Sequence, residues 1–133
     1  MPDSTAVTNG QFYESPIPGV VQTIYASYTA TAALAAASVI RMVSAPAGCK
    51  VVDMKIKFTA FGAGRTVDIG DGDDVDRYLD GGDVSAAGVL SCSASAGFFH
   101  EYDAADTIDI TVLGDTMPED AVIEMVLLYT LNQ

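Results

Sequence analysis

The chain has 133 residues with 18 Asp and Glu against 6 Lys and Arg, which gives a formal net charge of -12 at pH 7. Half of the residues are hydrophobic and 18% are charged, which excludes a disordered acidic tail because such tails lack the apolar surface that offsets chain entropy. The length predicts one domain that buries about two-thirds of its surface, and the shortage of cations excludes nucleic acid and anionic membranes as partners.

No targeting segment or cysteine motif is expected. Met1 is followed by Pro2 and Asp3 rather than by a basic segment and an apolar run, which argues against a secretion signal. The longest uncharged stretch contains many hydroxyl side chains and one leucine, so it does not predict a membrane span. Cys49 and Cys92 stand in no metal-binding spacing and are expected to be free, buried thiols.

Residues 1–19 are predicted to form an extended N-terminal arm. They are rich in Pro, Gly, Ser, Thr and Asn, which favour turns and extended chain over packed structure. Their apolar side chains are isolated anchors, so Phe12, Tyr13 and Ile17 are the candidate interface residues of the arm. Residues 20–133 are expected to form a single domain.

The first half of this domain is predicted to be made of strands. Residues 20–31 have the β-branched and aromatic composition of a strand, which we expect to end in a turn within the alanine-rich run that follows. Residues 39–43 predict a second strand and residues 46–48, Pro-Ala-Gly, predict a turn. This turn and the strand after it suggest an antiparallel pair.

The clearest alternation of apolar and polar side chains covers residues 52–60, a period of two that indicates a half-buried strand. The face expected to be buried consists of Val52, Met54, Ile56, Phe58 and Ala60. The face expected to contact solvent consists of Asp53, Lys55, Lys57 and Thr59.

The second half also predicts strands. Residues 66–69 form a short one, and a further strand is expected at 107–114, where Ile108, Ile110 and Val112 alternate with polar residues. Residues 121–131 are apolar at nearly every position, and their β-branched residues favour a strand covered on both faces over a helix. Six to eight short strands predict an all-β fold: a single antiparallel β-sandwich, jelly-roll-like, with the small barrel as alternative.

The loop at residues 68–83 contains seven aspartates and four glycines. Asp-Gly loops supply the oxygen ligands that Ca²⁺ prefers, although the spacing does not fit an EF-hand. A solvated turn in which glycines adopt positive φ is the favoured interpretation, with Arg77 partly neutralising the loop. The candidate calcium ligands are Asp68, Asp71, Asp73, Asp74 and Asp76.

The sequence predicts no enzyme. An exposed Asp-Gly loop offers no environment that separates two carboxyl pKa values for acid–base catalysis. His100 is the only histidine and no nucleophile motif is present, so it is expected at the surface or in an interface. Aromatic residues could line a carbohydrate platform, but in a sandwich of this size they are expected to be mostly core. These residues are Phe61, Tyr78, Phe98, Phe99 and Tyr102.

The apolar segment 121–131 and the apolar anchors of the arm give more hydrophobic surface than one small sandwich can bury. This excess suggests a surface that binds a partner. Association of identical copies into a closed ring is the common solution.

The run from TAALAAASVIRMVSAPAGCKVVDMKIKF to RTVDIGDGDDVDRYLDG resembles a pattern in small virion proteins of tailed bacteriophages. In that pattern an Ala-rich lead, a Val-Ile strand, a Pro-Ala-Gly turn and an alternating strand precede an Asp-rich loop that ends in Arg-Tyr. The resemblance covers roughly residues 32–80, and Ser38 departs from it where Gly-Asp would be expected. The matching segments are residues 33–37, 39–43, 46–48, 51–58 and 68–78.

The resemblance implies a non-catalytic virion structural protein without cofactors, similar to a capsid decoration or cement protein. Its implied partners are the major capsid protein and further copies of itself in a homotrimer, and its implied place is the capsid surface of the virion after synthesis in the host cytoplasm. The arm would lie across capsid subunits or exchange with a neighbour. The alternatives are a head-to-tail connector or tail component and, from another class, a soluble carbohydrate- or calcium-binding β-sandwich.

Overall fold

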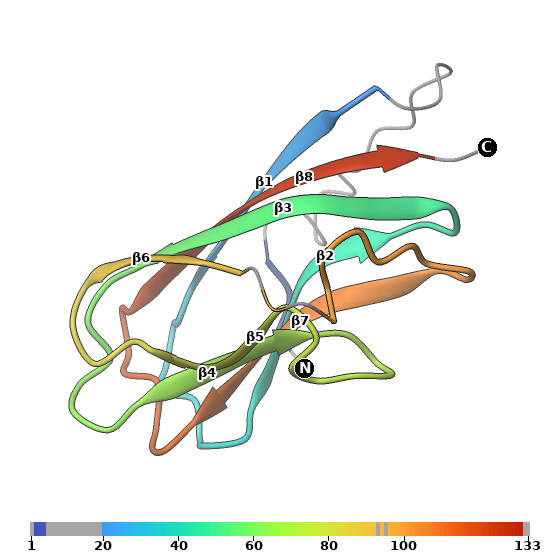
Figure 1. Cartoon of the computed structure of the whole chain (residues 1–133). Helices are drawn as coiled ribbons and strands as arrows, with labels where there is room; N and C mark the ends of the chain where they lie inside the picture. The colour runs from blue at the N-terminus through green and yellow to red at the C-terminus, as the bar shows by residue number, and fades with distance from the viewer. Residues whose placement is uncertain (1, 5–19, 93, 95, 132–133) are drawn as a thin grey trace.

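The computed structural model describes residues 2–4, 20–92, 94 and 96–131, and these residues form eight strands and no helix (Figure 1). No helix that could span a membrane therefore exists within the described part of the chain. The strands are β1 (Gln22–Thr29), β2 (Val39–Ala45), β3 (Cys49–Phe58), β4 (Thr66–Gly70), β5 (Leu79–Asp83), β6 (Gly88–Ser91), β7 (Asp106–Leu113) and β8 (Val122–Leu131).

The strands form two four-stranded sheets, with the orders β1-β8-β3-β6 and β2-β7-β4-β5 (Figure 1). All pairs between these strands are antiparallel. The chain alternates between the sheets at every step except β4 to β5, which are neighbours in one sheet. This arrangement of eight strands in two sheets is a jelly roll, so the predicted all-β antiparallel sandwich is confirmed.

The turn at residues 46–48 is present, but it connects strands of different sheets. The Cys49 N–H donates to the Pro46 carbonyl at 3.2 Å, and Gly48 has a φ of 87°. β2 pairs with β7 and β3 pairs with β8, so the predicted antiparallel pair is wrong. Ala45 and Cys49 are both buried at the ends of the turn. The chain therefore crosses from one layer to the other instead of folding back within a sheet.

The buried face of β3 differs from the predicted one because of a β-bulge. Met54, Ile56 and Phe58 are buried as predicted. The pairing of β3 with β8 shifts register between Val51 and Asp53, which places Val51 in the core and leaves Val52 half-buried. A bulge inserts one extra residue and so changes which side chains face inward. The predicted burial of Val52 and of Ala60, which is exposed, is wrong.

Strand β8 confirms the predicted strand near the C-terminus, but its two faces are not alike. Ile123, Met125 and Leu127 are buried, whereas Val126 and Leu128 on the opposite face are half-buried. β8 lies between β1 and β3, and one of its faces contributes to the core between the sheets. The prediction that both faces are covered is therefore wrong, and the outer face leaves apolar side chains accessible.

Residues 2–4 lie along the outer edge of β2. The Arg41 N–H donates to the Pro2 carbonyl at 3.0 Å, and the Ser4 N–H donates to the Arg41 carbonyl at 2.8 Å in a parallel bridge. Asp3 accepts from the Arg41 guanidinium at 2.6 Å, and the Ser4 hydroxyl, which is buried, donates to the Met42 carbonyl. The first residues of the predicted arm thus protect an edge strand.

Candidate functional site

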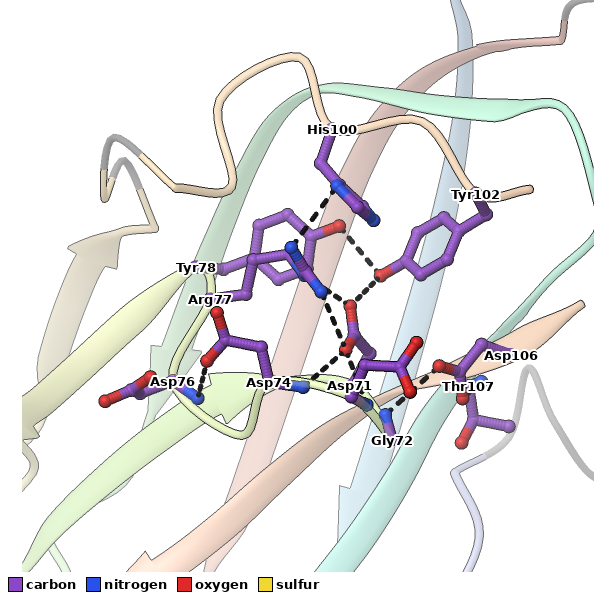
Figure 2. A network of polar contacts seen from close by, with 11 residues as sticks. Asp71, Gly72, Asp74, Asp76, Arg77, Tyr78, His100, Tyr102, Asp106 and Thr107 are labelled. Atoms are coloured by element: carbon purple, nitrogen blue, oxygen red, sulfur yellow. Dashed lines mark hydrogen bonds and ion pairs between the residues drawn. The ribbon is translucent and has the colours of Figure 1, made fainter. Parts of the chain in front are cut away.

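The Asp-rich loop between β4 and β5 is organised around one buried carboxylate, that of Asp71 (Figure 2). The backbone N–H groups of Asp73 and Asp74 donate to its Oδ1 at 3.0 and 2.9 Å. The Asp71 N–H in turn donates to the Asp74 carbonyl at 2.9 Å. Asp71 therefore closes the loop on itself in the way that Asp side chains commonly do in turns.

Arg77 and two tyrosines complete the shell around this carboxylate (Figure 2). Arg77 Nε donates to Asp71 Oδ2 at 2.6 Å, and the Tyr102 hydroxyl donates to the same oxygen at 2.9 Å. The Tyr78 hydroxyl lies 2.8 Å from that of Tyr102. Because the Tyr102 proton points to Asp71, Tyr78 must be the donor of this pair. The predicted neutralising role of Arg77 is confirmed, whereas the description of the loop as solvated fails at Asp71.

The pKa values follow from these contacts. Burial alone would raise the pKa of Asp71, but the hydrogen bonds from Arg77, from Tyr102 and from two backbone N–H groups outweigh it and lower the pKa. Burial is the main cause that raises the pKa of Tyr102 and of Tyr78. At neutral pH the group is therefore one carboxylate, one guanidinium and two neutral phenols, held together by mutual hydrogen bonds.

The candidate calcium ligands are not brought together. Asp71 is committed to its own donors, Asp68 accepts from the Gly81 N–H at 2.7 Å, and Asp74 accepts from the Asp76 N–H at 3.4 Å. Asp73 is exposed. No group of three or more His, Cys, Asp or Glu within the described residues is placed to hold a metal ion.

The same network joins this loop to the segment 97–105, which precedes β7, and to Asp106, the first residue of β7. Arg77 Nη1 lies 3.3 Å from His100 Nδ1, and the Gly72 N–H donates to Asp106 at 3.1 Å (Figure 2). Between the two segments is an open hollow of about 460 Å³. Its charged lining is acidic, with Asp73 and Asp103 exposed at the surface. We call this region the acidic end; its four carboxylates are Asp73, Glu101, Asp103 and Asp106.

The five aromatic residues considered for a carbohydrate platform divide into two groups. Phe61, Tyr78 and Tyr102 are buried as expected. Phe98 and Phe99 are 50% and 56% exposed, and their rings meet edge to face at a centroid distance of 4.3 Å. The expectation that these aromatics are mostly core is therefore confirmed for three of the five, and Phe98 and Phe99 are the exceptions. Phe99 adopts a φ of 63°, which is strained for a bulky residue.

Both cysteines are free and buried, as the sequence predicts, and burial raises the pKa of each thiol to about 12. The predicted interface residues of the arm, Phe12, Tyr13 and Ile17, lie outside the described residues.

The outer face of the β1-β8-β3-β6 sheet carries the chain's three lysines, a feature that the sequence analysis did not single out. Lys50, Lys55 and Lys57 all come from β3, and the latter two are exposed. The bulge in β3 keeps them on one side, opposite Thr130, Val126 and Glu124 of β8. The three arginines are instead ion-paired within the chain, as Arg41–Asp3, Arg65–Asp115 and Arg77–Asp71.

Apolar side chains surround the lysines on this face. Tyr25 of β1 is 54% exposed and Val89 of β6 is 62% exposed. A shallow hollow of about 220 Å³ lies between them. We call this surface the lysine face; the side chains used below are Tyr25, Lys55, Lys57, Val89, Glu124 and Val126.

No protein-family model matches the sequence, and no curated protein matches it. Solved structures do match. A chain in the capsid of Ralstonia phage GP4 has a TM-score of 0.82 at 18% identity, over 98% of this chain and 97% of that chain. The fold is one found in phage capsids. A chain in the capsid asymmetric unit of cyanophage Pam1 has a TM-score of 0.71 at 17% identity, over 92% of this chain and 96% of that chain.

A third match is a chain in the acidic stable capsid structure of Helicobacter pylori bacteriophage KHP30. Its TM-score is 0.58 at 16% identity, over 86% of this chain and 95% of that chain. This phage-capsid fold therefore extends over nearly the whole length of the three matching chains, and each of them is little more than one such sandwich.

Proposed function

We propose that the protein is a non-catalytic virion structural protein, a decoration or cement subunit that binds the outer surface of a tailed-phage head. The observation that carries the proposal is the match to a chain of the Ralstonia phage GP4 capsid over 98% of this chain. The similar length of the matching chains supports an accessory subunit, because each is covered almost completely by one small sandwich. The partners are the major capsid protein and further copies of this chain in a homotrimer.

The buried network supports a structural role for the acidic loop. Arg77 and Tyr102 both donate hydrogen bonds to Asp71. These bonds make the loop rigid, and the polar groups that form them are not free to react with a substrate. Many weak contacts between such rigid subunits and a repeating shell would give strong retention through multivalency. In this proposal residues 1–19 form the arm, with Phe12, Tyr13 and Ile17 as its contacts to neighbouring capsid subunits.

The proposal is tested by the copy number of the chain in purified virions, measured by quantitative mass spectrometry against the major capsid protein. A copy number comparable to that of the major capsid protein supports a decoration subunit. A few copies per virion would instead indicate a connector or tail component. Absence from virions would return the chain to the class of soluble binding proteins.

Binding to the shell provides a second test. The purified protein is mixed with heads that lack it and sedimented, with a deletion of residues 1–19 beside the full chain. We expect the full chain to bind and the deletion variant to remain folded and lose binding. Because residues 2–4 cover the β2 edge, a third variant that retains residues 1–4 and lacks only 5–19 separates loss of the arm from exposure of that edge.

A further inference from the structure

The distribution of charge on this molecule is uneven. The chain carries a net charge of -12, its arginines are ion-paired internally, and all three lysines lie on one sheet face. Within the described residues no ion pair involves a lysine. The lysine face also contains Asp53 and Glu124, but the three lysines of β3 outnumber these two carboxylates on this side of the sheet. It is therefore where an acidic protein surface would meet attraction rather than repulsion.

The chemistry of the lysine face suits a protein contact. Tyr25 and Val89 are both more than half exposed on either side of Lys55 and Lys57. Lysine stems lie along apolar surface while their ammonium groups reach outward. An exposed aromatic side chain with aliphatic neighbours is typical of the centre of an interface, and polar side chains are typical of its solvent-accessible rim.

The acidic end supplies the matching surface on the same molecule. Its four carboxylates surround a hollow of about 460 Å³. The loop that carries Asp73 is fixed by the buried Asp71 network, and the Gly72 N–H is tied to Asp106. The hollow is therefore part of a rigid surface with fixed negative charge, which reduces the entropy lost on binding.

Lys50 borders the acidic end, because it pairs with Glu101 in a β-bridge, whereas Lys55 and Lys57 lie further from it along β3. The acidic end lies where β3 begins, because the Val51 N–H donates to the His100 carbonyl. Lys57 lies seven residues further along β3 than Lys50, roughly 23 Å at the rise of an extended strand. In Figure 1 the loop between β4 and β5 lies at one end of the sandwich, and β3 and β8 run side by side along the length of one sheet. No part of the acidic end among the described residues therefore covers Lys55 and Lys57, which are exposed.

We propose that the lysine face of one copy docks on the acidic end of a second copy, so that identical chains associate head to tail. This inference deepens the homo-oligomer part of the proposed function and rests on it. One docking surface is a sheet face and the other is an end of the sandwich. Each contact therefore rotates one copy relative to its neighbour. Heterologous contacts of this kind close into rings when the rotation permits. Free copies repel one another because of their net negative charge. Each contact in a closed ring neutralises part of that charge.

The experiment measures the association of the full-length purified chain by sedimentation velocity at about 0.1 and about 1 M salt, where the screening lengths are roughly 10 and 3 Å. The first variant is Lys55→Glu with Lys57→Glu, and the second is Asp73→Lys with Asp103→Lys. Each creates like charges at every contact, and we expect each to raise the apparent dissociation constant at least tenfold. The higher salt concentration should weaken association of the wild type.

The variant that combines all four substitutions is the matched control. Its net charge is again -12, and every contact regains opposite charges with the signs exchanged. We expect it to associate like the wild type. A second control, Ala35→Asp with Ala36→Asp, adds negative charge on the exposed β1–β2 loop outside both surfaces and should leave association unchanged. Circular dichroism verifies that each variant is folded.

A monomeric wild type would overturn the inference, as would charge-reversed variants that associate normally or a four-fold variant that stays monomeric. Association that strengthens with salt would also contradict it. Binding to heads is measured separately on the same samples. Failure of head binding by an associated wild type refutes the proposed decoration role alone. A monomer that binds heads refutes this inference together with the homotrimer, and leaves the decoration role standing.

Discussion

Replacing the buried carboxylate, Asp71→Asn, should destabilise the protein strongly. Asn keeps the shape and one oxygen for the N–H groups of Asp73 and Asp74, but its amide cannot accept from Arg77 and Tyr102. Removing one partner of a buried ion pair costs about 3–5 kcal/mol. The Arg77 side chain is 16% exposed and retains some access to water, so we expect a loss of about 2–4 kcal/mol.

The assay is urea and thermal unfolding followed by circular dichroism. A chain of 133 residues unfolds with an entropy of about 0.28 kcal/mol per kelvin, so the expected loss lowers Tm by about 7–14 °C. The matched control is Asp73→Asn on the same loop, where the exposed side chain should change stability by less than about 0.5 kcal/mol. A loss below about 1 kcal/mol for Asp71→Asn, or equal effects of both variants, would refute the structural role of the network.

The pH dependence provides an independent check on the same residue. The pKa of Asp71 lies below its ordinary value, so its contribution to stability is present above that ordinary value and is lost as the pH falls through the folded-state pKa. The wild type should therefore lose stability as the pH falls below about 4. Asp71→Asn should show a weaker loss over the same range.

Four further outcomes follow from the structure. Ile56→Ala should cost about 2–5 kcal/mol because Ile56 is 1% exposed, whereas the exposed Lys55→Ala should stay within about 0.5 kcal/mol in urea unfolding. Tyr102→Phe removes a donor to Asp71 and leaves a buried neighbour unpaired, so it should lower stability by about 1–3 kcal/mol. Burial raises the pKa of Asp109 to about 6, so Asp109→Asn should stabilise the protein at pH 7 by on the order of 1 kcal/mol after allowance for screening. The gain should shrink as the pH falls below about 6 and should vanish only near pH 4, the ordinary pKa of an Asp carboxyl. Millimolar calcium should leave Tm unchanged, because the loop carboxylates are not assembled into a site; a concentration-dependent rise would contradict this.

The sandwich was predictable from sequence because period-two alternation survives in the strands that bury one face. Residues 107–114 predicted β7 almost to its bounds, and Ile108 and Ile110 are fully buried. β5 was missed because its sequence, Leu-Asp-Gly-Gly-Asp, has low β propensity and is held by pairing with β4. The β3 bulge was missed because a one-residue register shift leaves no mark in composition.

The partner of each strand could not be read from local patterns. The turn at residues 46–48 is the same in sequence whether the chain folds back in one sheet or crosses to the other, and only the burial of Ala45 and Cys49 distinguishes the two. The candidate site has the same difficulty. Seven aspartates predicted an acidic loop, but the burial of Asp71 depends on Tyr102, which is 31 residues away. The lysine face depends on the β3 bulge and on three pairings among the four strands β1, β8, β3 and β6.

The segment that resembles virion proteins contains residues that stabilise the fold. Such a resemblance therefore indicates the fold of the chain but not its binding partner. Asp71, Arg77 and Tyr78 belong to the buried network, and a Cβ on Gly70 would collide with the backbone of Asp74. Substitutions at these positions would disturb the loop, because each of them is held by close packing or by a buried hydrogen bond. Contacts with a shell or a second copy use exposed side chains, which physical constraints leave free to vary. The pattern in the sequence therefore predicts the jelly roll, whereas the partner must be inferred from the surface, where the lysine face and the acidic end carry complementary charge.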